Sequence, residues 1–268
     1  MSKLRSPWRD NCRFAVALVG TTTRASFALR YAFWMSAGMM LLNNLLFFST
    51  WWILMQRFGH VEGWRLEDVM CLFGISATGY GVAVILAGGL FDLSRKIYDG
   101  ELDSWLTQPK SVLVQALGSR THMSGWGDLA SGVGLLALSG TLGWSTLPLV
   151  VVGLACATTA FVACGVAAHS LAFWLGRTHE LSRAIFEFTV TFSVYPPSLF
   201  GPHIKWILFT LLPAGFASYL PVELLRAPSA RTLLACVLGT LLYASGAVWL
   251  FNRGVRRYSS GSRFAAPV

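Results

Sequence analysis

No charged residue lies between Asp128 and Arg177, and this run limits the possible folds of the chain more than any other feature. As one helix, at about 1.5 Å of rise per residue, the run would extend roughly 72 Å. A bilayer core is only about 30 Å thick, so the run fits two crossings joined by a turn. The stretch 143–148 (Gly-Trp-Ser-Thr-Leu-Pro) is the natural break, because proline cannot continue the hydrogen bonds of the preceding helical turn. The sequence therefore predicts two transmembrane helices in this run.

Four further apolar windows are long enough for one crossing each: 31–56, 69–91, 184–204 and 232–252. Residues 206–222 are also apolar, but Pro213 and Pro221 interrupt them, which suits a segment that enters the membrane and returns on the same side. Hydrophobic residues make up 54% of the chain and charged residues 12%, so lipid is the expected solvent. We expect one all-α transmembrane domain over residues 1–268, with six transmembrane helices.

The distribution of Lys and Arg predicts which loops are cytoplasmic. With six crossings, most of the 21 basic residues fall on one side: Lys3, Arg5, Arg9, Arg13, Arg24, Arg30, Arg95, Lys96, Lys110, Arg120, Arg177, Arg183, Arg253, Arg256, Arg257 and Arg263. The positive-inside rule then places both termini in the cytoplasm, in the inner (cytoplasmic) membrane of a bacterium. Segment 1–30 and tail 253–268 become basic cytoplasmic ends. Anionic membrane lipids explain the net charge of +9 more simply than nucleic acid does.

Residue types that carry out chemistry are sparse. A P-loop ends in Gly-Lys-Ser/Thr, but none of the four lysines follows a glycine, so we expect no ATP site in this chain. The five histidines are dispersed, and the cysteines lack metal-site spacing. We therefore expect no catalytic residue, no metal and no cofactor. His179 and Glu180 are the nearest approach to an acid/base pair, and adjacent helical residues do not share a face.

The loop at 91–112 differs from the other predicted cytoplasmic loops because it is acidic. Its apolar residues recur at near-helical spacing, which predicts one or two short amphipathic helices: Leu93, Ile97, Leu102, Trp105 and Leu106. It also carries Asp92, Asp99, Glu101 and Asp103. Such carboxylates are unfavourable against anionic headgroups, so a protein partner is the better interpretation. Gly100 is expected to cap one helix, and Glu101 and Asp103 to begin the next.

Two blocks of sequence resemble the permease subunits of ABC type-2 exporters. Gly100-Glu101-Leu102-Asp103, followed by Leu106 and Pro109, is similar to the Gly-Glu-Leu-Asp...Pro cytoplasmic loop of one group in that family. The second block resembles the family's fifth span and the external re-entrant hairpin, here 199–222; its marker residues are Tyr195, Pro196, Pro197, Pro213, Gly215 and Pro221. The Pro196-Pro197 pair departs from the single proline that is more usual there.

The resemblance implies an exporter permease whose cytoplasmic coupling helix docks in a groove of an ATP-binding subunit. The implied coupling residues are Leu93, Ile97, Asp99, Gly100, Glu101, Leu102, Asp103 and Trp105. In this interpretation two copies of the ATP-binding subunit hold ATP and magnesium. A second permease subunit, identical or homologous, completes the complex. Glu101 and Asp103 either meet cationic groups of the ATPase or fix the local helical turn.

Three polar residues within the predicted spans are candidates for a pathway or a gate. Glu187 is costly in a membrane span, by about 2.5–3.5 kcal/mol on insertion scales. Arg183, one turn earlier, offers a salt bridge that would satisfy it. Asn43 and Asn44 need interhelical partners, and simple packing is the default for them.

Two other functions remain open from the sequence. An intramembrane lipid-modifying enzyme would use His179, Glu180 or Glu187. A non-transporting membrane scaffold would use the acidic loop to recruit a cytoplasmic partner.

Overall fold

The computed structural model describes residues 7–258, which form helices joined by turns, with no β-strand among them. The elements are α1 (Pro7–Ala28), α2 (Arg30–Phe58), α3 (Leu66–Leu86), η1 (Gly88–Asp92), α4 (Leu93–Asp99), α5 (Asp103–Leu106), α6 (Val112–Gly118), α7 (Gly125–Leu138), α8 (Leu147–Ser170), α9 (Ala172–Leu175), α10 (His179–Ser193), η2 (Pro197–Leu199), α11 (Pro202–Thr210), η3 (Gly215–Tyr219), α12 (Leu220–Arg226) and α13 (Ala230–Arg257).

Four helical segments are long and apolar enough to cross a membrane: α2, α3, α8 continued by α9, and α13. The bent pair 202–226 would bring the number to five if it formed one span. The expected all-α membrane protein is thus confirmed. Helices α7 and α10 are shorter, with 14 and 15 residues. At about 1.5 Å per residue they extend roughly 21–23 Å, less than a bilayer core.

The long charge-free run breaks where its turn residues predict. Helix α7 ends at Leu138 and α8 begins at Leu147, with Pro148 in its first turn. The Thr146 hydroxyl accepts from the Gly143 N–H at 2.9 Å and so closes the turn before α8. Proline lacks the N–H that a first helical turn leaves unpaired, which is why it is tolerated there.

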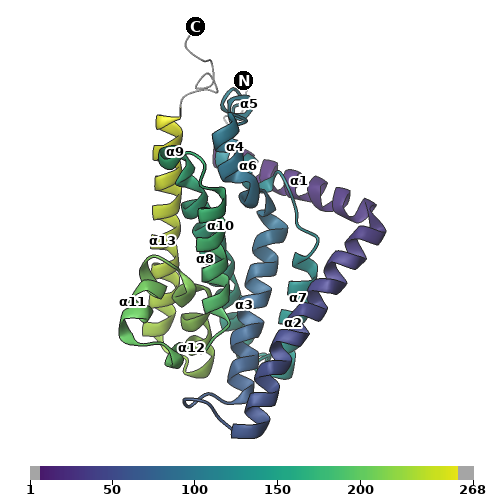
Figure 1. Ribbon diagram of the computed structural model, residues 1–268, viewed down its shortest axis with the longest axis vertical. Helices are drawn as coiled ribbons and strands as arrows, with labels where there is room; N and C mark the ends of the chain where they lie inside the picture. The colour runs from purple at the N-terminus through teal and green to yellow at the C-terminus, as the bar shows by residue number, and fades with distance from the viewer. Residues whose placement is uncertain (1–6, 259–268) are drawn as a thin grey trace.

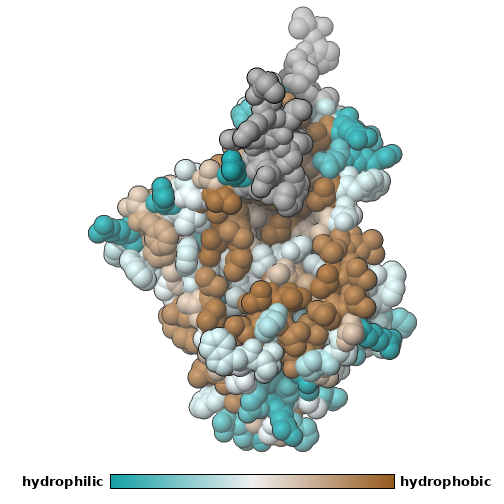
Figure 2. All heavy atoms as spheres, turned by 180° about the vertical axis from the view of Figure 1, so that it is seen from behind, coloured by the Kyte–Doolittle hydropathy of each residue, from teal (hydrophilic) through white to brown (hydrophobic). Residues whose placement is uncertain are grey.

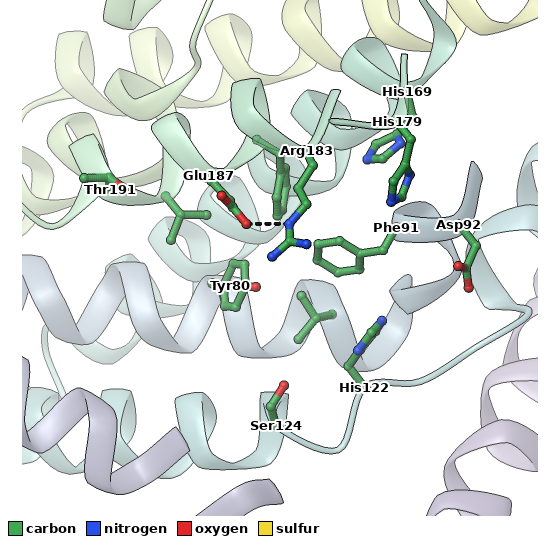
Figure 3. A pocket seen from close by; sticks show the side chains of 13 residues that line it. Tyr80, Phe91, Asp92, His122, Ser124, His169, His179, Arg183, Glu187 and Thr191 are labelled. Carbon is green, nitrogen blue, oxygen red and sulfur yellow. Dashed lines mark hydrogen bonds and ion pairs between the residues drawn. The ribbon is translucent and has the colours of Figure 1, made fainter. Parts of the chain in front are cut away.

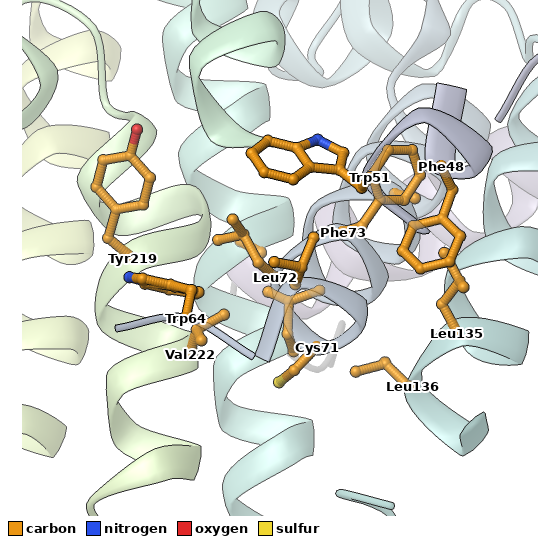
Figure 4. Close-up of a cluster of buried hydrophobic side chains, with 14 of the residues drawn as sticks. Phe48, Trp51, Trp64, Cys71, Leu72, Phe73, Leu135, Leu136, Tyr219 and Val222 are labelled. Carbon is orange, nitrogen blue, oxygen red and sulfur yellow. The ribbon is translucent and has the colours of Figure 1, made fainter. Parts of the chain in front are cut away.

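Helix α3 forms the centre of the bundle, and α7 and α8 pack on it (Figure 1). Its span is 78% buried, compared with 22% for α2 and 17% for α13. Small residues permit the close approach: a Cβ on Gly79 would lie 2.6 Å from that of Ala157 in α8. Aromatic and branched side chains close the core around Leu72 and Phe73 (Figure 4).

The first described helix, α1, is a feature that the sequence reasoning missed. Segment 1–30 was expected to be a polar cytoplasmic end, but Pro7–Ala28 is helical and runs across one end of the bundle (Figure 1). The Thr22 and Thr121 hydroxyls lie 3.0 Å apart, and Leu18 packs beside Gly118 of α6. Phe14, Leu18 and Thr22 recur at i, i+4 spacing, a signal that was available in the sequence.

The bundle has two distinct ends. Helices α4, α5, α6 and α9 gather at one end with the last turns of α13 (Figure 1). The loop between α2 and α3 lies at the other end, and α11 and α12 lie in that half of the molecule (Figure 1). Helices α11 and α12 belong to a helix pair bent by 87°.

Candidate functional site

The acidic segment folds as two short helices with a glycine between them, as its spacing predicts. Gly100 ends α4 in a left-handed conformation at φ 83°, which a side chain would disfavour. The Glu101 N–H then donates to the Lys96 carbonyl at 3.0 Å. Asp103 is the first residue of α5, where a negative charge is favourable.

Three of the residues assigned to ATPase coupling lie in the core. Leu93, Ile97 and Leu102 are 0–5% exposed, and they pack in one cluster with Phe173 and Phe251. Their amphipathic spacing correctly indicates that these apolar side chains pack against another surface. The chain's own membrane helices cover these side chains, so none of the three is exposed to a partner in this structure, while the coupling role of the segment stays a prediction. Their packing attaches the acidic segment to the helical bundle.

Lys96 holds the segment together from within. Its ammonium group donates to the Ser119 hydroxyl at 3.0 Å and lies 4.9 Å from the centre of the half-buried Trp105 ring. Burial lowers the pKa of Lys96, despite the attraction of Asp92 and Glu101. A contact of this kind ties α4 to α5 and to the start of the α6–α7 linker.

The other end of the segment meets the last turn of the chain that the structure describes. Asp103 lies beside the hydroxyl of Tyr258, whose pKa is raised to about 12 by burial and, in second place, by this carboxylate. Tyr258 also packs edge-on against Phe173 at 6.2 Å. The acidic segment therefore contacts both α9 and the end of α13.

The exposed part of the segment is a compact tip. Asp99 and Glu101 are exposed, and so are Ser104 and the stretch 106–109. Leu106 is 43% exposed and is the large apolar side chain of this tip. We call residues 99–109 the acidic tip. Its exposed surface carries two carboxylates and one large apolar side chain.

A cavity of about 530 Å³ lies below this segment, where α3, α8 and α10 meet the loops around residues 92 and 122 (Figure 3). Its lining is mixed in charge and includes Tyr80, Val84, Phe91, Asp92, His122, Ser124, His169, His179, Arg183, Phe186, Glu187, Val190 and Thr191. Three of the five histidines meet here, although the sequence reasoning regarded them as dispersed. Among residues 7–258, no group of three His, Cys, Asp or Glu side chains is placed to hold a metal.

A buried serine connects two of these histidines. Ser94 in α4 is 1% exposed, and its hydroxyl lies 2.9 Å from Nδ1 of His169 and 3.3 Å from Nδ1 of His179. Ser94 shares the buried face of α4 with Leu93 and Ile97, and this position next to the apolar residues is the signal in the sequence that points to its burial. One hydroxyl thus joins the acidic segment to the ends of α8 and α10.

Asp92 fixes the neighbouring loop. Its carboxylate pairs with Arg95 at 2.9 Å and with Arg120 at 3.2 Å. His122, two residues further on, stacks edge-on with Phe91 at 4.8 Å. Burial lowers the pKa of His122, and the nearby Arg120 lowers it further. Both effects favour the neutral form of the imidazole over the protonated form.

The predicted salt bridge of Glu187 is present, but the carboxylate is not buried. Arg183 Nε donates to Glu187 Oε1 at 2.7 Å, and both side chains are more than half exposed along the cavity (Figure 3). The buried carboxylate is instead Asp128, at 4% exposure. The sequence reasoning had taken Asp128 as the boundary of a span, and had regarded Glu187 as the carboxylate inside one.

Asn44 is the partner of Asp128. Its side-chain amide donates to Asp128 Oδ1 at 2.8 Å and to Ser131 Oγ at 2.9 Å, which fastens α2 to α7. The interhelical packing expected for Asn44 is therefore present. Asn43 is exposed, and its one described polar contact is to the Met40 sulfur at 4.0 Å.

The residues assigned to the hairpin anchor it to the bundle. Tyr195 packs against Phe47 and Trp51, and Pro196 is buried. Pro197 begins η2, and Pro213 lies in the break between the two bent helices. Gly215 lies against the Phe209 ring, and Pro221 lies beside Gly153 in α8. The Tyr219 hydroxyl, in η3, donates to the Phe192 carbonyl of α10 at 2.6 Å.

Comparison with known proteins adds one finding. A family model described as ABC-2 family transporter protein matches residues 39–262, which is most of the chain and includes every span candidate after the start of α2. No curated protein and no solved structure shows detectable similarity to it.

Proposed function

Because the chain belongs to the ABC-2 family of transporter proteins, we propose that it is the permease subunit of an exporter driven by a separate ATP-binding subunit. Membership makes it a multi-pass membrane protein of a transporter family and favours a transport role over catalysis. It also implies an ATP-binding partner and a second permease. The fold, the acidic tip and the cavity give these roles specific residues.

The proposed topology has six crossings, with both termini in the cytoplasm of a bacterium. They are α2, α3, α7, α8 with α9, α10 and α13. The short helices α7 and α10 then cross together with the irregular segments at their ends. Segment 199–222 forms an external re-entrant hairpin, since a crossing there would carry the basic end of α13 to the outside.

One observation carries the coupling role: the acidic tip is joined to the membrane helices by buried packing and hydrogen bonds. Leu102 of the tip is buried together with Leu93 and Ile97 of α4, and Ser94 bonds to the ends of α8 and α10. A displacement of the tip by an ATP-binding subunit is therefore transmitted to these helices rather than absorbed by a flexible loop. Asp99 and Glu101 are the groups that meet cations of the partner.

The pathway is proposed to follow the exposed face of α10. Glu180, Arg183, Glu187 and Thr191 recur at i, i+3 and i+4 spacing and are all exposed, and all except Glu180 line the cavity. A second permease, identical or homologous, would close this face into a water-filled route. Two copies of the ATP-binding subunit, carrying ATP and magnesium, would drive the pair.

The test is a charge reversal at the acidic tip. Asp99→Lys/Glu101→Lys is expected to abolish co-purification with the cognate ATP-binding subunit, and with it substrate-stimulated ATP hydrolysis. The matched control is Glu62→Lys/Glu223→Lys, two exposed carboxylates in the opposite half of the molecule, and it should retain both. A complex that survives reversal at the tip with full ATPase stimulation refutes the proposed docking role.

A lipid-modifying enzyme is the second candidate, and the Ser94, His169 and His179 cluster gives it a possible nucleophile and base. The 1% exposure of Ser94 argues against it, because a substrate cannot reach this hydroxyl. Turnover of a phospholipid by the purified chain, lost in Ser94→Ala, would favour the enzyme. The third possibility is a membrane scaffold that does not transport. ATP-dependent movement of a substrate into vesicles that contain the whole complex would exclude it.

A further inference from the structure

The last turns of α13 form one side of a second cavity, which the proposed transport function does not use. Its volume is about 600 Å³, and its lining is Trp174, Trp249, Asn252, Arg253, Arg256 and Arg257. No acidic residue lines it. None of the three arginines has an ion-pair partner among the described residues. The cavity is therefore a cationic site without its own counter-charge.

The cationic groups converge because of helical spacing. Trp249, Arg253 and Arg256 or Arg257 lie three to four residues apart, on one face of α13. The Arg253 guanidinium lies 5.6 Å from the centre of the Trp249 ring, and Trp174 of α9 contributes the other wall. Guanidinium groups present fixed pairs of N–H donors, which match phosphate oxygens.

An apolar stripe leads along the membrane to this cavity. Leu234, Leu238, Leu241 and Leu242 are 55–77% exposed, and Trp249 is 61% exposed. They continue the face of α13 that carries the arginines. The opposite face packs on α8, so the stripe points away from the bundle. A tryptophan between an apolar face and a cationic group is typical of the membrane interface.

We propose that the cavity binds the headgroup of an anionic phospholipid, with the acyl chains along the leucine stripe. The three arginines hold the phosphate, and Asn252 offers a further hydrogen bond. A soluble phosphate would satisfy the arginines but leave the stripe and both tryptophans unused. An acidic protein segment would have to lie within the bilayer to use the stripe. The assignment of this lipid to the cytoplasmic leaflet rests on the proposed topology. Binding of the lipid itself does not require an ATP-binding subunit.

The site adjoins the support of the acidic tip. Phe173, next to Trp174, packs on Phe251 at 5.6 Å and occupies the space beside Gly254. A bound headgroup would therefore hold α9 and α13 together, next to the cluster that carries Leu93 and Leu102.

The experiment measures lipid binding to the purified chain in detergent by native mass spectrometry. Dioleoylphosphatidylglycerol and dioleoylphosphatidylcholine carry the same acyl chains and differ in net charge. Wild type should retain one phosphatidylglycerol more tightly than any phosphatidylcholine. Arg253→Gln/Arg256→Gln/Arg257→Gln should weaken this lipid about 100-fold, since each cation near an anionic surface contributes a factor of about five. Phosphatidylcholine binding should not change.

The matched control is Arg13→Gln/Arg24→Gln/Arg30→Gln, which removes the same charge from the same end of the bundle. This variant should keep the tightly bound phosphatidylglycerol, and equal weakening in both triple variants would overturn the proposal in favour of a diffuse surface field.

Displacement of the lipid by an equal concentration of inorganic phosphate would overturn the proposal in favour of a soluble anion, and displacement by an acidic peptide would do so in favour of a protein. If the triple variant does not fold, Arg253→Gln alone should weaken binding about fivefold, and unchanged binding would also overturn the proposal.

Discussion

The hydroxyl of Ser94 lies 2.9 Å from Nδ1 of His169, although the two residues are 75 positions apart in the chain. The same oxygen lies 3.3 Å from Nδ1 of His179. A hydroxyl has one proton to donate, so at least one of these two ring nitrogens must carry a proton and donate to Ser94. The arrangement therefore selects a tautomer in at least one imidazole.

Removing this hydroxyl should destabilise the protein. Ser94→Ala leaves two buried or half-buried imidazole nitrogens without their partner, so the free energy of unfolding should fall by about 1–3 kcal/mol. Unfolding of the purified protein in a detergent titration measures the change. Ser104→Ala is the control, because that hydroxyl is exposed and bonds only to the nearby Glu101 carbonyl. Equal loss in both variants would contradict the assigned role of Ser94.

Asn44 and Asn43 should respond differently to alanine. Asn44→Ala removes the donor to a buried carboxylate and should cost about 1–3 kcal/mol, whereas exposed Asn43→Ala should stay within about 0.5 kcal/mol. A double-mutant cycle with Asp128→Ala should give a coupling energy of about 0.5–2 kcal/mol. Additive losses would mean that the 2.8 Å contact contributes nothing to the attachment of α2.

Two glycines of α7 provide a test of helix packing. A Cβ on Gly132 would meet the backbone N and side-chain oxygen of Thr78, whereas a Cβ on Gly134 would meet nothing within 4 Å. Gly132→Ala should therefore destabilise the protein by about 1–3 kcal/mol. Gly134→Ala should be neutral or stabilising by up to about 1 kcal/mol, since alanine is the better helix former. The same unfolding titration measures both, and a Gly132→Ala variant as stable as wild type would exclude the close α3–α7 contact.

His122 should make stability depend on pH. Because burial lowers its pKa in the folded state, the unfolded chain takes up a proton near pH 6.5 while the folded one resists it. The contribution of this neutral imidazole is complete above pH 6.5 and is lost as the pH falls below that value. His122→Gln should therefore show a smaller drop in melting temperature than wild type between pH 7.5 and 5.5. The exposed His60→Gln serves as control and should behave as wild type; a His122→Gln drop as large as that of wild type would reject the assignment.

Glu187 should matter for transport and not for stability. Its salt bridge with Arg183 is more than half exposed, and exposed i, i+4 pairs contribute only about 0.3–0.5 kcal/mol. Glu187→Gln should leave unfolding nearly unchanged and should lower substrate-stimulated ATP hydrolysis in the assembled complex. Glu180→Gln is the comparison, because Glu180 lies on the same exposed face of α10 but outside the cavity. Equal hydrolysis in both variants and wild type would remove Glu187 from the pathway.

The parts of the fold that depend on neighbouring residues were predictable. Gly143 to Pro148 breaks the long apolar run, and Gly100 ends α4, because each acts on its own turn of helix. The Arg183–Glu187 pair was predictable for the same reason, since one helical turn separates the two residues.

The parts that depend on distant residues were not predictable. Asp128 was taken for a boundary because its partner Asn44 is 84 residues away. The histidines at 122, 169 and 179 come from three different segments that meet only in the folded bundle. For Leu93, Ile97 and Leu102, periodicity shows that they need cover but does not show which surface provides it. The chain's own helices and a partner subunit are equally compatible with that pattern.

Helix α2 makes contact with the rest of the chain along a narrow strip, and its remaining circumference is free. That strip belongs to the core, because Phe48, Trp51 and Met55 pack in the central cluster and Asn44 bonds to α7. The outward side of α2 carries large exposed apolar side chains such as Trp34, Leu46 and Ile53, and the middle of the molecule is hydrophobic over a wide area (Figure 2). One helix thus serves both as a wall of the internal core and as a surface that lipid or a neighbouring protein must cover.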